Sequence, residues 1–200
     1  SSTISTMGVT LGAASIPLGI LADKYGRRNM LILGNLFASV SLIGFALTTN
    51  VALVLLIAVV QGIGEAAFAV SFSALVADRA GDERRTAAFS LGAFLGWTSG
   101  AVGAFAISSV LLIEGFGLSG QQSHVVLYVL VGLLSLSVTP FMLGIHETKT
   151  KGQAQRKMIL PRKSKKVLVR FSVYSVAIAL GAGLFVPLMA NWFNAAYGVT

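Results

Sequence analysis

The sequence predicts an all-α protein whose helices cross a membrane, that is, a polytopic transmembrane helix bundle. Of its 200 residues, 55% are hydrophobic and only 11% are charged, whereas soluble domains carry roughly a quarter charged residues. The apolar residues gather in runs of about 20, the length that an α-helix needs to cross a hydrocarbon core of roughly 30 Å. No strand-like alternation competes with these runs, so helices are the expected elements.

Six runs follow one another, each bounded by polar or charged residues. The first has no charge and ends at "DKYGRR", the second ends at "TTN", and the third ends at "ADR". The fourth lies between "DERR" and "EGFG", the fifth ends before a long basic stretch, and the sixth ends near Trp192 and Tyr197, which are typical of a membrane interface. The expected spans are 3–22, 30–48, 51–77, 87–113, 125–145 and 171–193.

The basic residues predict how the spans are oriented. All 15 Lys and Arg residues lie in the odd-numbered connections, 23–29, 78–86 and 146–170. Because Lys and Arg are retained on the cytoplasmic side, these connections are expected to face the cytoplasm of a multi-pass protein in the cell membrane. Topology thus accounts for the net charge of +8 without nucleic-acid binding. The connection 146–170 is also a candidate for binding anionic lipid headgroups, with ordinary anchoring as the alternative.

The composition also argues against catalysis and metal binding. The chain has no cysteine, which excludes disulfides and thiolate metal sites. Paired catalytic carboxylates, a nucleophile motif, a phosphate-binding loop and zinc-ligand spacing are all missing from the sequence. We therefore expect neither an enzyme nor a bound cofactor or metal.

The first apolar run ends within residues 19–28, "GILADKYGRR", where several charged residues lie close together. Gly26 can supply the backbone freedom for a tight reversal, and the basic residues can hold the turn at an anionic surface. The stretch resembles the signature G-x-L-A-D-R/K-x-G-R-R/K of major facilitator superfamily transporters. The positions that match are Gly19, Leu21, Ala22, Asp23, Lys24, Gly26, Arg27 and Arg28.

This resemblance covers the whole chain and implies its organisation. The six spans would be helices two to seven of a twelve-helix protein, so the sequence would be a piece cut from something longer. Residues 1–145 would belong to the N-terminal helical half, 146–170 would be the basic cytoplasmic linker, and 171–200 would begin the C-terminal half.

In the family, the signature belongs to a cytoplasmic charge cluster that stabilises the outward-facing state, with an acidic partner at the end of the fourth helix. Asp78 stands at the matching place in this chain. The resemblance therefore implies an ionic latch between Arg27 and Asp78. The alternative is a solvated surface pair, worth ~0 to 1 kcal/mol. The expected latch residues are Gly19, Asp23, Gly26, Arg27, Arg28 and Asp78.

Glu65 is the only charged residue inside any expected span, and Gln61 lies on the same helical face. An ionised group at the bilayer centre costs about 2.5 to 3.5 kcal/mol on insertion scales, so it generally faces a bundle interior or an aqueous cavity. The two residues are candidates for proton coupling or substrate binding, with interhelical packing as an equal alternative. "QGIG" resembles part of the family pattern R-x-x-q-G-x-G, but Ala58 occupies the arginine position.

Small and polar residues repeat at helical spacing in three spans. Gly92, Gly96, Gly100 and Gly103 form one face, and Gly8, Gly12, Ser15 and Gly19 form another. Both faces predict close helix packing. In the last span, Gly183 and Pro187 predict a kink, and Asn191 and Asn194 on the same stripe predict a gate or substrate contact. A passive kink with interfacial asparagines is the alternative.

These features favour a secondary active transporter that moves a small solute by alternating access, with proton-coupled efflux or symport as the version that would use Glu65. Two alternatives remain open at this point. One is a non-transporting membrane sensor or scaffold that uses the basic connection, and the other is an inactive fragment of a transporter.

Overall fold

The computed structural model describes residues 2–145 and the isolated positions 170, 173–174, 192 and 196. Five long α-helices make up the described part: α1 (Ser2–Tyr25), α2 (Arg27–Leu47), α3 (Val51–Arg79), α4 (Gly81–Glu114) and α5 (Gly120–Leu143). Each contains a stretch long and apolar enough to cross a membrane. All five belong to the first of two compact units, Ser1–Ala154 and Gln155–Thr200.

The predicted all-α class and the first five spans are confirmed, and five spans, not the predicted six, are seen among the described residues. The expected span 171–193 and most of the connection 146–170 lie outside the described residues. The fifth helix begins earlier than the predicted 125, because Ser119 and Gln122 form a capping box before its apolar stretch. In it, the Gln122 amide donates to Ser119 Oγ at 3.4 Å and the Ser119 amide donates to Gln122 Oε1 at 3.1 Å.

A single residue, Gly26, joins α1 to α2. Its φ of 99° lies in the left-handed region that favours glycine. The Gly26 amide donates to the Ala22 carbonyl at 3.0 Å, and the Met30 amide donates to the Gly26 carbonyl at 3.2 Å. Hydrogen bonding therefore continues almost unbroken from one helix into the next while the chain changes direction.

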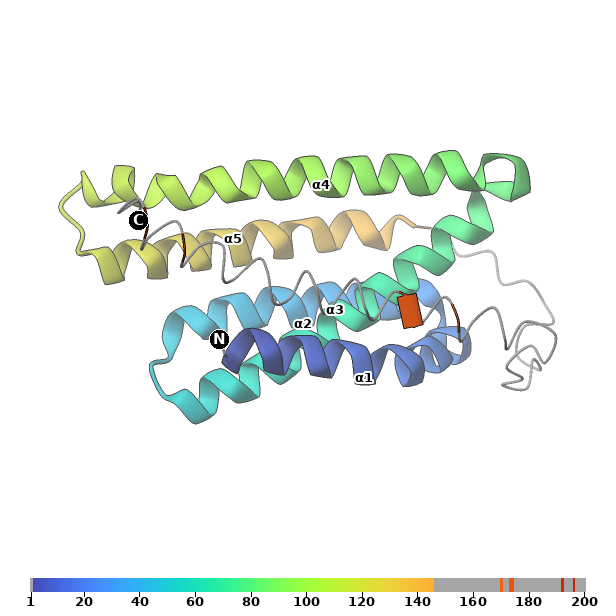
Figure 1. The fold of residues 1–200 in the computed structure, drawn as a ribbon, viewed down its shortest axis with the longest axis horizontal. Coiled ribbons are helices and arrows are strands. Elements are labelled where there is room, and N and C mark those ends of the chain that lie inside the picture. The colour runs from blue at the N-terminus through green and yellow to red at the C-terminus, as the bar shows by residue number, and fades with distance from the viewer. Residues whose placement is uncertain (1, 146–169, 171–172, 175–191, 193–195, 197–200) are drawn as a thin grey trace. The chain divides into compact units, whose positions relative to one another are not determined.

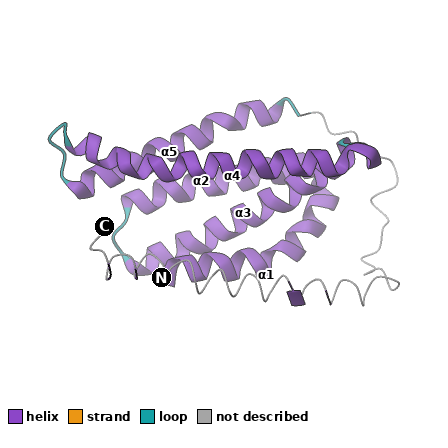
Figure 2. Ribbon diagram, turned by 45° about the horizontal axis from the view of Figure 1, so that its top comes forward, coloured by secondary structure: helices purple, strands orange, loops and turns teal. Residues whose placement is uncertain are grey.

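Helix α3 packs extensively against both α1 and α2, and α5 packs against α2. Figure 1 shows α1 running beside α3, and Figure 2 shows the same helices from a view turned by 45°. Helix α4 makes far fewer contacts, which are with α3 and α5. The described bundle thus consists of a tightly packed group, α1, α2, α3 and α5, and a loosely attached α4.

Glycines set the closest helix contacts, but at positions outside the two predicted glycine faces. A Cβ added to Gly34 of α2 would lie 2.6 Å from the Phe68 amide nitrogen of α3, and one added to Gly64 would lie 2.8 Å from the Ala38 nitrogen. A Cβ added to Gly62 would lie 2.7 Å from the Met7 carbonyl oxygen of α1. These backbones approach so closely that only glycine fits.

The two predicted glycine faces are largely open within the described residues. Apart from the chain neighbours and the backbone of the same helix, no described atom lies within 4 Å of the position that a Cβ would take at Gly8, Gly12, Gly96, Gly100 and Gly103. Gly19 meets a Val70 methyl at an ordinary 3.4 Å, and Gly92 meets the Phe72 ring at 3.7 Å. The described residues therefore supply no close partner for most of these glycines, since helical spacing identifies a face but not its partner.

Candidate functional site

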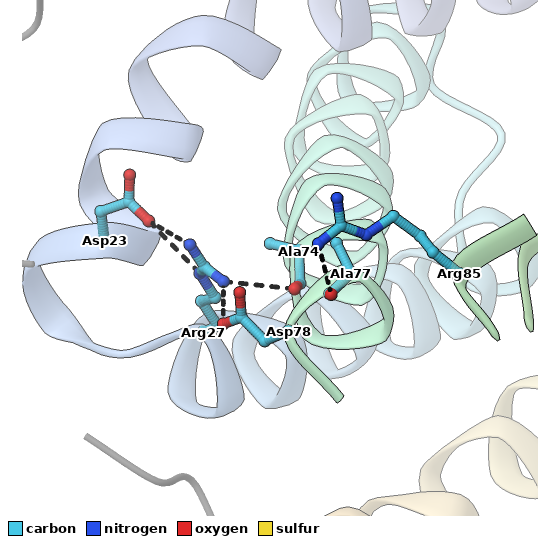
Figure 3. A network of polar contacts seen from close by, with 6 residues as sticks. All are labelled: Asp23, Arg27, Ala74, Ala77, Asp78 and Arg85. Atoms are coloured by element: carbon cyan, nitrogen blue, oxygen red, sulfur yellow. Dashed lines mark hydrogen bonds and ion pairs between the residues drawn. The ribbon is translucent and has the colours of Figure 1, made fainter. Parts of the chain in front are cut away.

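The expected latch residues lie at one end of the bundle, where α1 meets α2 and α3 meets α4; we call it the charged end. Arg27, the first residue of α2, donates from Nε and Nη2 to Asp23 Oδ1 of α1, at 3.3 and 3.1 Å. Its Nη1 donates to the Ala74 carbonyl of α3 at 3.2 Å and forms an ion pair with Asp78. Figure 3 shows this guanidinium between the two carboxylates.

Local structure explains why these groups meet. The Gly26 turn keeps Asp23 and Arg27 four residues apart, so the two side chains lie one helical turn from each other. Asp78 and the Ala74 carbonyl belong to the last two turns of α3, at the negative end of the helix dipole, which attracts cations. One arginine thereby joins the ends of three helices.

Exposure differs sharply within this ionic cluster of Asp23, Arg27 and Asp78. The Arg27 side chain is 16% exposed, whereas those of Asp78 and Asp23 are 50% and 61% exposed. The cation is thus largely removed from solvent while both carboxylates stay open to it. Charge-assisted bonds to several acceptors hold the guanidinium in place, but the exposed carboxylates keep each ion pair within the weak range of surface pairs.

Arg85 of α4 adds a second cation at the end of α3. Its Nη2 donates to the Ala77 carbonyl at 3.2 Å, as Figure 3 shows. Sequence reasoning treated Arg85 only as a topology signal. Its position soon after the end of α3 could have indicated a role in capping that helix, because cations interact favourably with the last carbonyls of a helix.

Arg28, an expected latch residue, contacts the end of α5 instead of the carboxylates of the ionic cluster. Its Nη2 donates to the Leu143 carbonyl at the end of α5. The Arg28 Nε is buried and has no hydrogen-bond partner among the described residues. The structure therefore directs two neighbouring arginines to different helices.

Gln61 and Glu65 meet on α3, where Gln61 Nε2 donates to Glu65 Oε1 at 3.0 Å. Gln61 is only 7% exposed, and its Oε1 has no partner among the described residues. Ala58 occupies the arginine position of the family pattern R-x-x-q-G-x-G, and it is completely buried. A long basic side chain could not occupy that place without moving the neighbouring helices.

A buried polar seam between α2 and α5 was not predicted. Asn35 Nδ2 donates to the Ser135 carbonyl and to Thr139 Oγ1, each at 3.0 Å, and Ser39 Oγ donates to Ser135 Oγ at 2.6 Å. An asparagine within an apolar span was the available signal, because polar side chains inside membranes hydrogen-bond across helices.

The remaining candidates cannot be placed. Gly183, Pro187, Asn191 and Asn194 lie outside the described residues, so their expected kink and gate stay predictions. Across the residues that the structure describes, no group of three His, Cys, Asp or Glu side chains could hold a metal ion.

The fold and the charged end define a multi-pass helical membrane protein with an ionic cluster linking its helices. The Major Facilitator Superfamily pattern matches residues 1–200, so the chain belongs to that family. Membership of this transporter family confirms the recognition made from "GILADKYGRR" and the expectation that the chain is not an enzyme.

A curated relative gives a shorter match. It is an uncharacterized MFS-type transporter from Methanocaldococcus jannaschii, 35% identical over 77 residues. The match covers 38% of this chain and 19% of that protein. No solved structure gives a significant match.

Proposed function

We propose that the chain is part of a secondary active transporter that moves a small solute by alternating access, with the ionic cluster as its conformational latch. The observation that carries this proposal is the half-solvated cluster of Asp23, Arg27 and Asp78, which ties α1, α2 and α3 together at one end. Family membership supports transport as the activity.

A latch must hold one state and still release it. An exposed ion pair is worth about 0 to 1 kcal/mol, and 1 kcal/mol changes the ratio of two states by roughly fivefold. Asp23 and Asp78 are exposed enough for water to replace their bonds to Arg27. The cluster can therefore bias the transporter toward one conformation without trapping it there. Gly19 and Gly26 would contribute by keeping α1 close to α3 and to α2.

Glu65 and Gln61 are our candidates for coupling. Gln61 Nε2 donates to Glu65 Oε1, and the Gln61 Oε1 acceptor is buried with no hydrogen-bond partner among the described residues. Oxygen acceptors are suited to a proton or to a solute that carries donor groups, especially a cation. This supports proton-coupled transport, although the family pattern's arginine is replaced here by the buried Ala58.

The decisive experiment compares two modes of transport in proteoliposomes that contain the whole transporter. Glu65→Gln should abolish accumulation driven by a pH gradient and leave solute exchange intact, because it removes the titrating group but keeps its size. Ethidium is a suitable first probe, since it is a cation with amino donors. Glu114→Gln, at the end of α4, is the matched control.

Gradient-driven accumulation that survives Glu65→Gln would contradict proton coupling through this residue. The absence of any flux in a correctly folded protein would contradict transport and favour a scaffold or sensor. In that case the connection 146–170, with its basic residues, is the segment to test for anionic lipid.

A further inference from the structure

Arg27 and Arg28 begin the same helix but contact different neighbours. Arg27 contacts α1 and α3, whereas Arg28 donates from Nη2 to the carbonyl of Leu143, the last residue of α5. Successive residues on a helix do not share a face. One short segment of α2 therefore contacts the ends of three other helices.

The carbonyl of Leu143, the last residue of α5, needs a donor from elsewhere, because the Gly144 and Ile145 amides donate to Phe141 and Met142 instead. The last carbonyls of a helix have no intrahelical partners, and cations in the last turn commonly satisfy them. The last turn of α5 contains no basic residue. Arg28 provides the missing cation from another helix, where it also meets the negative end of the helix dipole.

An apolar cluster supports this contact from inside the bundle. Leu31 of α2, Leu75 of α3 and Met142 of α5 are buried together, and Ile145 packs against them. Leu31 lies one turn after Arg28, and Met142 immediately precedes Leu143. The Arg28 contact thus lies at the edge of the packing that holds α2, α3 and α5 at the charged end.

We propose that Arg28 is a positioning residue that clamps the end of α5 to α2. Its task is separate from that of Arg27, which serves the ionic cluster. This inference goes beyond the proposed latch and does not depend on transport. It means that a movement of α2 carries the end of α5 with it, even when Asp23 and Asp78 release Arg27.

Hydrogen exchange of backbone amides can test this in the whole transporter in lipid nanodiscs. The reporters are the Gly144 and Ile145 amides, which donate to Phe141 and Met142 at the end of α5. Arg28→Gln should raise their exchange rates about tenfold, the effect of losing one charge-assisted hydrogen bond. Exchange in residues 74–80 should stay unchanged.

Two further variants separate clamping from general stability. Arg28→Lys should keep most of the protection, because an ammonium group can still donate to a carbonyl. Arg27→Gln should give the opposite pattern, with faster exchange in residues 74–80 and none of the change at Gly144 and Ile145. An Arg28→Gln protein with unchanged exchange at the end of α5, or with equal increases in every helix, would overturn the proposal. An equal loss of protection in Arg28→Lys would also overturn it.

Discussion

One guanidinium joins the ends of three helices at the charged end. Arg27 is more buried than either of its carboxylate partners, and it also donates to the Ala74 carbonyl. Its removal would break the bonds to both carboxylates and to the Ala74 carbonyl at once, whereas the removal of one carboxylate leaves the bonds to the other two acceptors in place. The contributions of the cluster members should therefore be unequal.

We expect Arg27→Gln to destabilise the protein more than Asp78→Asn does. The loss of one half-exposed ion pair should cost about 1 kcal/mol or less, whereas the loss of hydrogen bonds from a charged donor costs about 1.5 to 3 kcal/mol. Unfolding in detergent measured for both variants and for the double variant would give the coupling between the two residues. Equal losses for the two single variants would show that Asp78 accounts for the whole effect of Arg27.

The sequence signature could place Arg27 and Arg28 at the same turn but could not separate their partners. Both residues are basic, and both match the family signature G-x-L-A-D-R/K-x-G-R-R/K. Their side chains leave the helix in different directions, and which helix lies in each direction depends on tertiary packing. Similarly, the pattern suggested Asp78 as a partner but gave no sign of the Ala74 carbonyl, because any residue type can supply a backbone oxygen.

At the scale of the helices, two devices hold the bundle together. Close glycine contacts join α3 to α1 and α2, and the seam of Asn35, Ser39, Ser135 and Thr139 joins α2 to α5. Lipid chains are as apolar as the helix surfaces, so packing and interhelical hydrogen bonds replace the hydrophobic effect as the attraction between helices.

Substitution of Gly34 should separate α2 from α3. In Gly34→Ala the new methyl would meet backbone atoms of Phe68 and Gly64 at less than 3 Å, so we expect a loss of about 1 to 3 kcal/mol in the free energy of unfolding. Gly96→Ala is the matched control, because its methyl enters open space and alanine favours helices by up to about 1 kcal/mol. Denaturation in SDS compares the two, and equal stabilities would contradict the close contact.

The polar seam makes a second prediction at this scale. Asn35→Ala removes the bonds to the Ser135 carbonyl and Thr139, and interhelical hydrogen bonds in membranes contribute about 0.6 to 2 kcal/mol. We expect a destabilisation of that size, measured in the same SDS assay. Ser137→Ala is the control, because Ser137 is exposed and its hydroxyl donates to the Leu134 carbonyl of its own helix. A change in Asn35→Ala no larger than in the control would contradict the seam.

Helix positions were predictable because span length and apolar content are local properties of the sequence. The pairing of the helices was not, as the glycines show: the four-residue spacing in α4 looked like a packing face, yet the close contacts occur at Gly34, Gly62 and Gly64. Periodicity describes one helix at a time, and several arrangements of the same helices satisfy it.

For the molecule as a whole, the distribution of basic residues predicts a fixed orientation in the membrane. The chain has no cysteine, so single cysteines can be introduced without background labelling. We expect a membrane-impermeant maleimide to label Tyr25→Cys from the cytoplasmic side and Phe116→Cys from the opposite side. Both positions are well exposed, at 58% and 87%. Labelling of both from the same side would contradict the predicted topology.

The joint at Gly26 also limits how the molecule can move. Two residue steps separate the end of α1 from the start of α2, and a fully extended chain covers only about 3.3 to 3.6 Å per residue. The two helix ends can therefore never be more than about 7 Å apart. Helix α1 cannot slide along α2 like a piston, and any relative motion at this end must be a swing about Gly26, with Arg27 beside the pivot.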